Sequence, residues 1–179
     1  MKYLIASDVH GSLDAAETLL TRFEEEKADR LILLGDLYYH GPRNPFPSGY
    51  EPAAVACLLN EVKEKLIVIK GNCDSEVDQM ISDFKFLPSF AVWVGGVRAL
   101  FTHGHKYNLG SPPPREFDIL FYGHEHTGYI KRSGGRLFVN PGSVSLPKGG
   151  TAASYAVWEG ESVVLKDLSS GRVLDCVDL

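Results

Sequence analysis

The chain has 179 residues, 44% of them hydrophobic, so it can bury one full core without disulfides. Its 18 basic and 23 acidic residues give a formal net charge of −5, which argues against binding to long nucleic acid through a basic surface. The three dispersed cysteines form no C-x-x-C pair, and no apolar run reaches the roughly 20 residues of a membrane helix. We therefore expect a single domain over residues 1–179, cytoplasmic and without membrane contact.

The first half of the chain alternates short apolar runs with amphipathic stretches. Their length and composition predict buried strands at residues 3–6, 31–34 and 66–69. A helix is predicted after the N-cap residue Ser12, and a second over residues 52–63, with a proline in its first turn. Strands that alternate with helices imply a parallel sheet with right-handed crossovers.

In the second half, pairs of short apolar runs flank glycine-containing turns. The pairs are residues 91–94 with 97–101, 129–132 with 136–139, and 155–158 with 163–166, and a single run lies at 119–122. Each pair is typical of a hairpin. Many short strands without long helices indicate a second, largely antiparallel sheet, so we expect an α/β fold with two sheets.

Polar clusters follow directly on five of the predicted strands. They are Asp8-Val9-His10, Gly35-Asp36, Gly71-Asn72-Cys73-Asp74, His103-Gly104-His105 and Gly123-His124-Glu125-His126. An α/β fold presents its strand-end loops to ligands, and Asp8 and His10 alternate along an extended chain and so point the same way. Five of the six histidines lie in these clusters. A satisfied core histidine is the ordinary explanation for one of them, but not for five at strand ends.

The residue types in these clusters indicate a metal site. Imidazole, carboxylate and amide oxygen, without a set of thiolates, suit Mn, Fe, Co, Ni or Zn better than Ca or Mg. The candidate ligands are too many for one ion, so we expect two divalent metal ions, with Mn²⁺ as the first choice. A carboxylate such as Asp36 can bridge two ions about 3.5–4 Å apart, which is the separation typical of dinuclear sites that cleave phosphate esters.

In their order along the chain, these motifs resemble those of the calcineurin-like metallophosphoesterases. The match runs from Asp8 to His126 as D-x-H, G-D, G-N-x-D, H-G-H and G-H-x-H, and the turn Asn140-Pro141-Gly142-Ser143 extends it. Within that family, residues 40–44, 71–80 and 140–150 are similar to the small bacterial YfcE-type phosphodiesterases. The resemblance implies an α/β/β/α sandwich of two packed mixed β-sheets flanked by helices, and hydrolysis of phosphodiester bonds.

The family pattern also implies which residues hold each ion. It places Asp8, His10 and His126 on one metal, Asn72, His103 and His124 on the other, and Asp36 between them as the bridge. A hydroxide that bridges the metals would then attack phosphorus in line with the leaving oxygen, while the ions neutralise charge on the phosphoryl oxygens.

The chain departs from the pattern of many family members at Cys73, where they carry a histidine that helps protonate the leaving group or hold the phosphate. We expect a catalytically quiet thiol in the pocket and a preference for aryl or otherwise activated diesters, because a thiol is a weak donor. The alternative is a covalent nucleophile, although no C-x₅-R loop surrounds Cys73. Asp74 either orients a neighbouring ligand or only stabilises its turn.

Three further residues are candidate substrate contacts. His105 lies two residues beyond a metal ligand, and His40 and Arg43 lie in the proline-rich loop 39–50, where the Arg43 guanidinium could fork onto a phosphate oxygen. For His105, a plain loop position bonded to backbone is the alternative. The loop is expected to be a substrate wall, a subunit contact or only a connection. Lys148 is expected to be a solvated turn residue.

The expected ligand is a small phosphodiester, and the apolar, proline-rich loop beside the site would suit a homo-oligomer. The alternative from another class is a catalytically quiet scaffold of the same fold that binds proteins, as the retromer subunit of this fold does. In the retromer subunits, loss of activity accompanies loss of the bridging Asp and of the Asn in the third motif. This chain keeps both, as Asp36 and Asn72. A nuclease of this fold is disfavoured by the acidic balance.

Overall fold

The computed structural model describes residues 1–179, and its first strand is buried on both faces. β1 (Lys2–Ala6) sends Leu4 into one hydrophobic core and Ile5 into another. A strand with two apolar faces belongs in the middle of a layered fold. Accordingly, β1 pairs in parallel with β2 (Arg30–Leu33) on one side and antiparallel with β10 (Ser154–Glu159) on the other.

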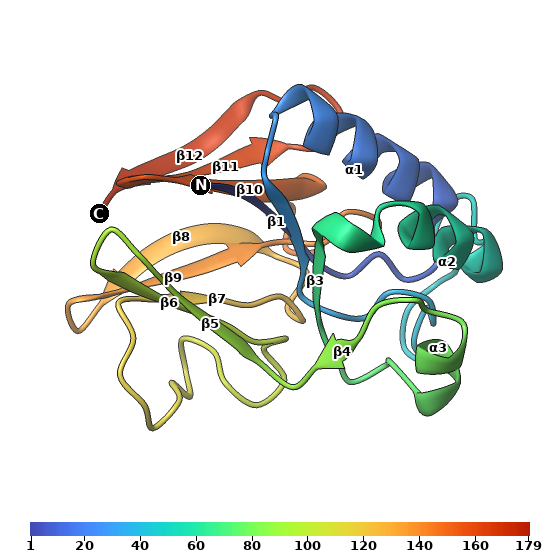
Figure 1. Cartoon of the computed structure of the whole chain (residues 1–179), viewed down its shortest axis with the longest axis horizontal. Coiled ribbons are helices and arrows are strands. Elements are labelled where there is room, and N and C mark those ends of the chain that lie inside the picture. Colours follow the sequence, from blue (N-terminus) through green and yellow to red (C-terminus); the bar gives the residue numbers. More distant parts are fainter.

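Two mixed sheets stack face to face (Figure 1). The larger has seven strands in the order β12-β11-β10-β1-β2-β3-β4, and its remaining members are β3 (Leu66–Ile69), β4 (Phe86–Leu87), β11 (Ser162–Asp167) and β12 (Val173–Asp178). The smaller has five strands in the order β5-β6-β7-β9-β8, which are β5 (Phe90–Val94), β6 (Val97–Phe101), β7 (Ile119–Phe121), β8 (Gly128–Ser133) and β9 (Arg136–Pro141).

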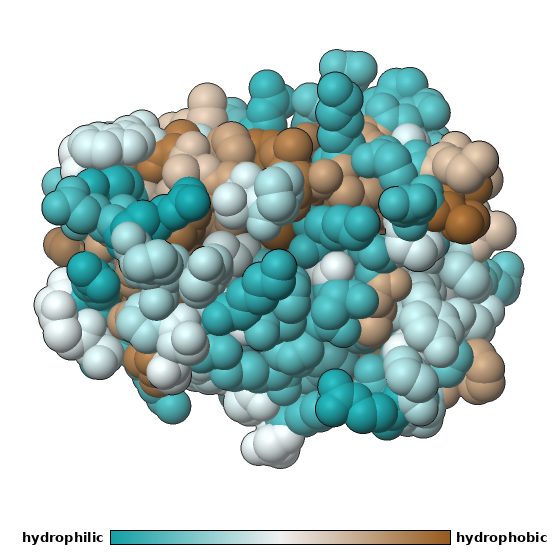
Figure 2. Space-filling model, turned by 90° about the horizontal axis from the view of Figure 1, so that it is seen from below, coloured by the Kyte–Doolittle hydropathy of each residue, from teal (hydrophilic) through white to brown (hydrophobic).

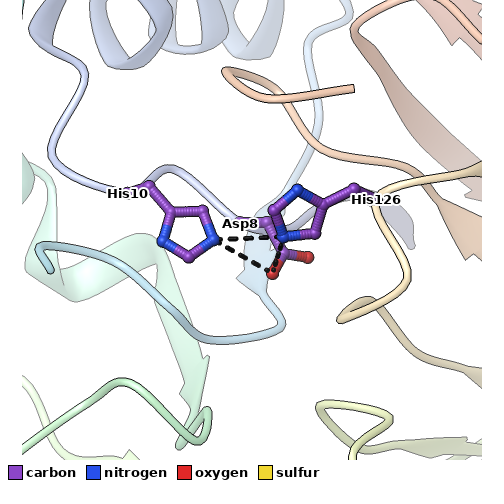
Figure 3. A group of neighbouring side chains, drawn as sticks. All are labelled: Asp8, His10 and His126. Atoms are coloured by element: carbon purple, nitrogen blue, oxygen red, sulfur yellow. Dashed lines mark hydrogen bonds and ion pairs between the residues drawn. The ribbon is translucent and has the colours of Figure 1, made fainter. Parts of the chain in front are cut away.

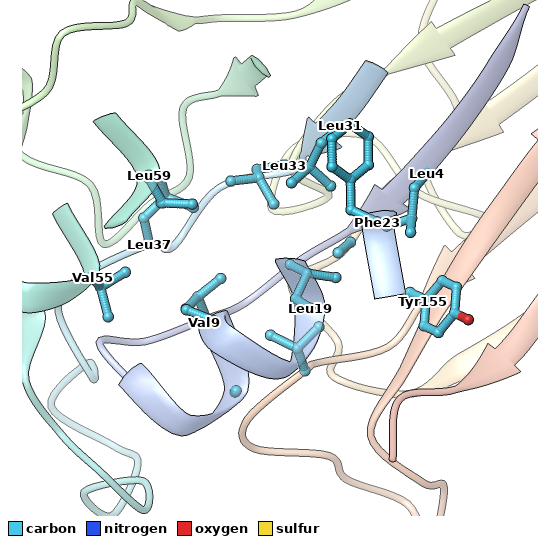
Figure 4. Packing of buried hydrophobic residues seen from close by; sticks show 14 of the residues in the cluster. Leu4, Val9, Leu19, Phe23, Leu31, Leu33, Leu37, Val55, Leu59 and Tyr155 are labelled. Atoms are coloured by element: carbon cyan, nitrogen blue, oxygen red, sulfur yellow. The ribbon is translucent and has the colours of Figure 1, made fainter. Parts of the chain in front are cut away.

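Two helices cover the outer face of the larger sheet. α1 (Leu13–Glu25) begins at Ser12, whose Oγ accepts a hydrogen bond from the backbone of Ala15, and α2 (Pro52–Glu61) begins with its proline and is followed by a 3₁₀ turn, Lys63–Lys65. Their apolar faces pack on the sheet around Leu19, Phe23, Val55 and Leu59 (Figure 4). Each such buried side chain contributes about 1.5–3 kcal/mol to folding. No helix of the protein is long and apolar enough to cross a membrane.

A second core fills the space between the sheets. Phe101 and Phe121 of the smaller sheet stack with their ring centroids 4.9 Å apart, and Trp158 of the larger sheet lies 5.9 Å from Phe121. The outer face of the smaller sheet is covered by the segment Thr102–Asp118, from which Phe117 packs against this face. The two mixed sheets with flanking helices are thus confirmed, with this segment in place of a helical layer on the smaller sheet.

The prediction that the second half forms a largely antiparallel sheet is wrong in two respects. β7 pairs in parallel with both β6 and β9, and the third hairpin, β10 with β11, belongs to the larger sheet. The reason lies in β10, which sends Tyr155 into one core and Trp158 into the other. A strand that is apolar on both faces needs a central place, and the edge of β1 provides it.

The other predicted elements are confirmed to within two residues. The structure adds three elements that were not predicted, namely β4, β12 and the short helix α3 (Glu76–Met80). All five polar clusters follow strands of the parallel parts, β1, β2 and β3 in one sheet and β6 and β7 in the other. Because the carboxyl ends of parallel strands lie at the same edge of a sheet, the clusters meet.

Candidate metal centre

The backbone takes an uncommon conformation where the polar clusters meet. Only six non-glycine residues have positive φ, and five of them belong to the clusters: Asp8, His10, Asp36, His124 and His126. Each such residue costs on the order of 1–3 kcal/mol, and strain of this kind gathers at functional sites. Asp8 and His10 therefore converge through left-handed turns, at φ 59° and 49°, and not through an extended chain as the sequence analysis assumed.

Asp8, His10 and His126 form a buried group, which we call the first half-site (Figure 3). Their side chains are at most 3% exposed. The Nε2 atoms of the two histidines lie 3.1 Å apart. Oδ1 of Asp8 lies 3.2 Å from Nε2 of His126 and 3.6 Å from Nε2 of His10. Three ligand atoms therefore face a common point.

The hydrogen bond at Nδ1 of each histidine determines whether its Nε2 carries a proton or a lone pair. Nδ1 of His10 lies 2.7 Å from the carbonyl oxygen of Tyr39, and Nδ1 of His126 lies 2.7 Å from that of Leu146. Because a carbonyl oxygen only accepts, each Nδ1 carries a proton, and in the neutral ring Nε2 offers a lone pair. Two lone pairs thus face each other beside Oδ1 of Asp8, which has no hydrogen-bond donor. A metal ion bound at this point would satisfy all three.

Asn72, His103 and His124 form the second half-site. Nδ1 of His103 lies 2.7 Å from the carbonyl oxygen of Leu34, and its Nε2 lies 3.0 Å from Oδ1 of Asn72. The rings of His103 and His124 have centroids 5.1 Å apart. His103 is buried, His124 is half-buried and Asn72 is exposed, so this half-site is open to solvent on one side.

Asp36 lies between the two half-sites. Its Oδ2 is 3.4 Å from Nε2 of His103 and 3.9 Å from Nε2 of His10. The ligand atoms of Asp36, His103 and His124 all lie within 4.8 Å of one another, as do those of the first half-site. Neutral imidazoles with carboxylates suit divalent transition metals, so these residues fit a pair of such ions with Asp36 shared.

The electrostatics of the centre favour positive charge. Burial raises the pKa of Asp8, but the imidazoles of His10 and His126 beside its carboxylate outweigh this effect when they carry a proton on Nε2, and they hold that pKa well below its usual range. Burial lowers the pKa of His103, but the hydrogen bond and charge of Asp36 raise it to about 9. Protons and metal ions therefore compete for the same acceptors.

Asp74 joins the loops after β2 and β3. Its Oδ2 accepts hydrogen bonds from the backbone of Asp36 at 2.8 Å and of Gly71 at 2.7 Å, and its Oδ1 accepts one from the backbone of Leu37 at 2.8 Å. Burial raises its pKa to about 6, against the effect of these donors. A Cβ on Gly71 would lie 2.1 Å from Oδ1 of Asp36, so this close approach requires glycine. Asp74 and Gly71 thus set the position of Asp36.

The turn from Asn140 to Ser143 and the residues after it hold Asp8. The backbone carbonyl of Asp8 accepts hydrogen bonds from Oγ of Ser143 at 2.7 Å and of Ser145 at 3.0 Å. Its Oδ2 accepts one from the backbone of His124 at 2.9 Å, which joins the two half-sites. Nothing in the residue types marked Ser145 in advance, since serine is common in turns.

The Cys73 thiol lies beside Asp36 with its sulfur atom engaged. The Cys73 backbone N–H donates to Oδ1 of Asp36 at 2.8 Å, and Sγ accepts from Nδ2 of Asn72 at 3.3 Å. Burial, together with the charge of Asp36, raises the pKa of the thiol to about 12. A thiolate is disfavoured there, which supports the quiet thiol over the covalent nucleophile.

A cavity of about 410 Å³ opens from the centre toward the loop 39–50. Asn72, Cys73 and His124 line it from the centre, and the loop contributes Tyr39 and residues 41–44. Loop 39–50 thus forms a wall of this cavity, and Arg43 is the predicted substrate contact that lines it.

Lys148 also lines this cavity, where its Nζ donates to Oδ1 of Asn44 at 3.0 Å. It is exposed, as expected of a solvated turn residue. The flanking glycines gave no signal of this contact.

The two other predicted substrate contacts lie elsewhere. His40 packs in an aromatic cluster, with ring centroids 4.3 Å from Phe46 and 5.4 Å from Tyr50, and it is not among the residues that line the cavity. His105 is exposed in a neighbouring cavity, with its ring centroid 5.5 Å from that of His103. A role for either residue in substrate binding stays a prediction.

Comparison with known proteins extends these observations. Residues 1–162 match the model of the calcineurin-like phosphoesterase superfamily domain. The chain is 46% identical over 176 residues to phosphodiesterase YfcE of Escherichia coli, which covers 97% of this chain and 96% of that protein. It is 30% identical over 165 residues to the probable metallophosphoesterase YsnB of Bacillus subtilis, covering 88% of this chain and 83% of that one.

Solved structures show the same relationship. The structure of YfcE, described as a phosphoesterase from E. coli, matches with a TM-score of 0.95 at 42% identity and covers 99% of both chains. A single mutant of Vps29 from Entamoeba histolytica matches with a TM-score of 0.69 at 20% identity, covering 100% of this chain and 99% of that one. At that identity the likeness shows the fold alone.

Proposed function

This chain belongs to the calcineurin-like phosphoesterase superfamily, and from that premise we propose that it is a metal-dependent phosphodiesterase acting on small phosphodiesters. The observation that carries the proposal is the set of acceptor atoms that face one another in the buried centre, an arrangement that bound metal ions would satisfy. The relative at 46% identity, itself named a phosphodiesterase, supports the reaction class.

We assign one ion to the first half-site and a second to Asn72, His103 and His124, with Asp36 as the shared ligand. The distances from Oδ2 of Asp36 to His103 and His10 support this sharing. Mn²⁺ is our first choice, and Ni²⁺, Co²⁺, Fe²⁺ and Zn²⁺ suit the same donor set.

Two cations bound there would lower the pKa of a water molecule for attack on phosphorus and neutralise charge on the phosphoryl oxygens. The chain's own residues would place the substrate. The cationic side chains of Arg43 and Lys148 line the cavity beside the centre and can hold an ester oxygen or its substituent. Cys73 offers only a weak proton donor near the leaving group, so aryl esters, which leave without a strong acid, should react best.

All seven candidate ligands are present and directed at one centre, which disfavours the protein-binding scaffold as an alternative. A homo-oligomer through the loop 39–50 stays a prediction. It is supported by the exposed rings of Tyr39 and Phe46, which are 43% and 66% accessible. A cytoplasmic location and the absence of binding to long nucleic acid also stay predictions.

The test is hydrolysis of bis-p-nitrophenyl phosphate by metal-stripped protein, with Mn²⁺ added back. We expect Mn²⁺-dependent release of p-nitrophenol. A correctly folded protein that releases none with Mn²⁺, Ni²⁺, Co²⁺, Fe²⁺ or Zn²⁺ would contradict the proposal and favour the scaffold.

A further inference from the structure

A second cavity, of about 420 Å³, adjoins the metal centre. Its walls come from the segment Thr102–Asp118, from Lys70 at the end of β3 and from the residues before β5. His103 lines this cavity and His124 lines the one next to loop 39–50, while their ring centroids are only 5.1 Å apart. The second half-site therefore separates two cavities, so a ligand held at the centre can extend into both.

The second cavity is cationic in a protein that is acidic overall. Lys70, Lys106 and Arg115 line it, and none of its twelve lining residues is an aspartate or glutamate. The formal net charge of the chain is −5, so this concentration of one sign does not follow from composition. Figure 2 views the molecule from the side on which the segment Thr102–Asp118 lies in Figure 1, and most of that surface is hydrophilic.

These three cations have no acidic partner within the protein. Five other basic residues have one, among them Lys63 with Asp83 and Lys166 with Glu26. Beside Arg115, the carboxylate of Glu116 lies 2.7 Å from the guanidinium of Arg98, so it is paired with that residue instead. The cavity thus presents free positive charge, and a concave surface concentrates such a field on a bound anion.

The segment that carries two of the cations is held in place by its own hydrogen bonds. Nδ2 of Asn108 donates to the carbonyl of Gly104 at 3.1 Å, and Oδ1 of Asn108 accepts from the backbone of Ser111 at 3.0 Å. The backbone of Leu109 donates to the Tyr122 hydroxyl at 3.2 Å. Because these bonds hold the backbone next to Lys106, the side chains and not the chain path need ordering when an anion binds.

One wall of the cavity is aromatic. The Tyr107 ring is 38% exposed and lines the cavity together with the buried Pro113. An exposed ring beside cationic side chains suits a ligand that joins a phosphate to a sugar and base, since bases stack on aromatic rings.

We propose that the second cavity binds a non-scissile phosphate of the substrate, held by Lys70, Lys106 and Arg115 while the scissile diester lies at the metal centre. The substrate class is then a nucleotide with one phosphodiester and one further phosphate group. This inference rests on the proposed phosphodiesterase function and adds to it the recognition of a second anion.

The kinetic test uses two substrates that differ in one phosphate. They are thymidine 5′-(p-nitrophenyl phosphate) with and without a 3′-phosphate, and the enzyme is loaded with Mn²⁺. We expect the 3′-phosphate to raise kcat/KM at least about tenfold, the range of one or two hydrogen bonds to a charged group. In the double variant Lys106→Ala/Arg115→Ala this ratio should fall toward one.

The matched control is Lys131→Ala/Arg172→Ala, which removes the same charge from exposed positions outside the cavity. It should keep the ratio of the wild-type protein. Equal kcat/KM for the two substrates in active wild-type enzyme would overturn the inference and leave the phosphodiesterase function intact. An equal fall of the ratio in the control would also overturn it, because net charge alone would then explain the effect.

A binding experiment tests the anion site independently of catalysis. If neither substrate is hydrolysed, the phosphodiesterase function is refuted, but binding to the second cavity can still be measured. Thymidine 3′,5′-bisphosphate and inorganic phosphate are titrated calorimetrically into the full chain with EDTA present. Bisphosphate binding that weakens at least about tenfold in Lys106→Ala/Arg115→Ala, but not in the control, supports the cavity as the anion site. No binding, or binding that both variants leave unchanged, overturns it. Inorganic phosphate that binds as tightly as the bisphosphate would assign the cavity to the free ion and overturn the substrate claim.

Discussion

The two halves of the metal centre contain similar ligands but are built differently. In the first half-site every side chain is buried, and the backbone carbonyls of Tyr39 and Leu146 orient both histidines. In the second, only His103 is buried and bonded to a carbonyl in this way, while Asn72 is exposed and His124 is half-buried. The first half-site is therefore a fixed part of the core, and the second faces the two cavities.

This difference suggests that the first half-site stabilises the fold and that the second receives the substrate. The first half-site joins Asp8, near the start of the chain, to His126 and to the turn with Ser143, so an ion there ties distant segments together. An ion that binds only the folded state stabilises it by mass action. The second half-site has open sides toward both cavities, which is where a substrate can approach.

The largest expected effect comes from Asp36, because we propose it as the ligand that both halves share. Asp36→Ala should lower Mn²⁺-dependent hydrolysis of bis-p-nitrophenyl phosphate by at least about 10³-fold, since both ions lose a ligand. Asp175→Ala, at an exposed residue of β12, is the control and should keep wild-type activity. An Asp36→Ala enzyme within tenfold of the wild-type rate would show that the halves do not share this ligand.

The next largest effect is the dependence of the rate on the leaving group of the substrate, which reports on the open second half-site and on Cys73. The wild-type enzyme should turn over aryl diesters at least about 10²-fold faster than alkyl diesters, because the Cys73 thiol is a poor acid. Cys73→His should narrow that gap by supplying a proton donor. Equal kcat/KM for aryl and alkyl esters in the wild-type enzyme would refute this role for the open side.

Substitution of Asp74 tests whether activity depends on the position of Asp36. Asp74→Asn keeps the shape but turns one acceptor into a donor that faces backbone N–H groups, so we expect activity to fall about 10–100-fold, as for other residues that orient ligands. Asp83→Asn, in an exposed ion pair with Lys63, serves as the comparison and should leave activity unchanged. A rate loss in both variants, or in neither, would contradict the positioning role.

Stability measurements should separate the two halves directly. With Mn²⁺ at about 100 times its Kd, the free energy of unfolding of the wild-type protein should rise by about 2.7 kcal/mol. His10→Ala should lose most of that gain, whereas His124→Ala should keep most of it, because the buried half-site provides the coupling. Urea denaturation with Mn²⁺ and with EDTA measures both, and equal losses would mean that the halves are equivalent.

A smaller effect on stability is expected at Glu26, far from the centre, where the stabilisation depends on pH and not on metal. Burial raises the pKa of Glu26, but hydrogen bonds with Lys166, Tyr155 and Lys2 outweigh it and lower that pKa. The stabilisation is present above the unfolded pKa of about 4.3 and is lost as pH falls through the lower folded value. Glu26→Gln should remove about 1 kcal/mol at neutral pH and less in acid, with or without Mn²⁺. A loss that is the same at both pH values would exclude this origin.

Much of this centre could be predicted because its ligands follow strands whose apolar runs are easy to recognise. Asp8, Asp36 and Asn72 follow three of the parallel strands of the larger sheet, and the carboxyl ends of such strands meet. The place of β10 was harder, because a hairpin pattern does not say which sheet the hairpin joins. The backbone of Asp8 and His10 was harder still, since left-handed turns at non-glycine residues depend on tertiary contacts.

The segments with little regular structure could be predicted least. The helix α3 and the strand β4 are too short for a periodic signal, and β12 is mostly exposed. Lys148 lines the cavity next to loop 39–50 and contacts Asn44, which lies more than a hundred positions away in the chain. No local sequence pattern predicts such a contact. Because substrate specificity depends on contacts of this kind, it is harder to read from a sequence than a set of candidate metal ligands.

The most direct test of the centre is a calorimetric titration of metal-stripped protein with Mn²⁺. We expect two ions per chain to bind in two steps, with the tighter step lost in His10→Ala and the weaker one lost in His124→Ala. A single ion per chain, or two ions of equal affinity that both variants weaken alike, would contradict the division into a fixed and an open half.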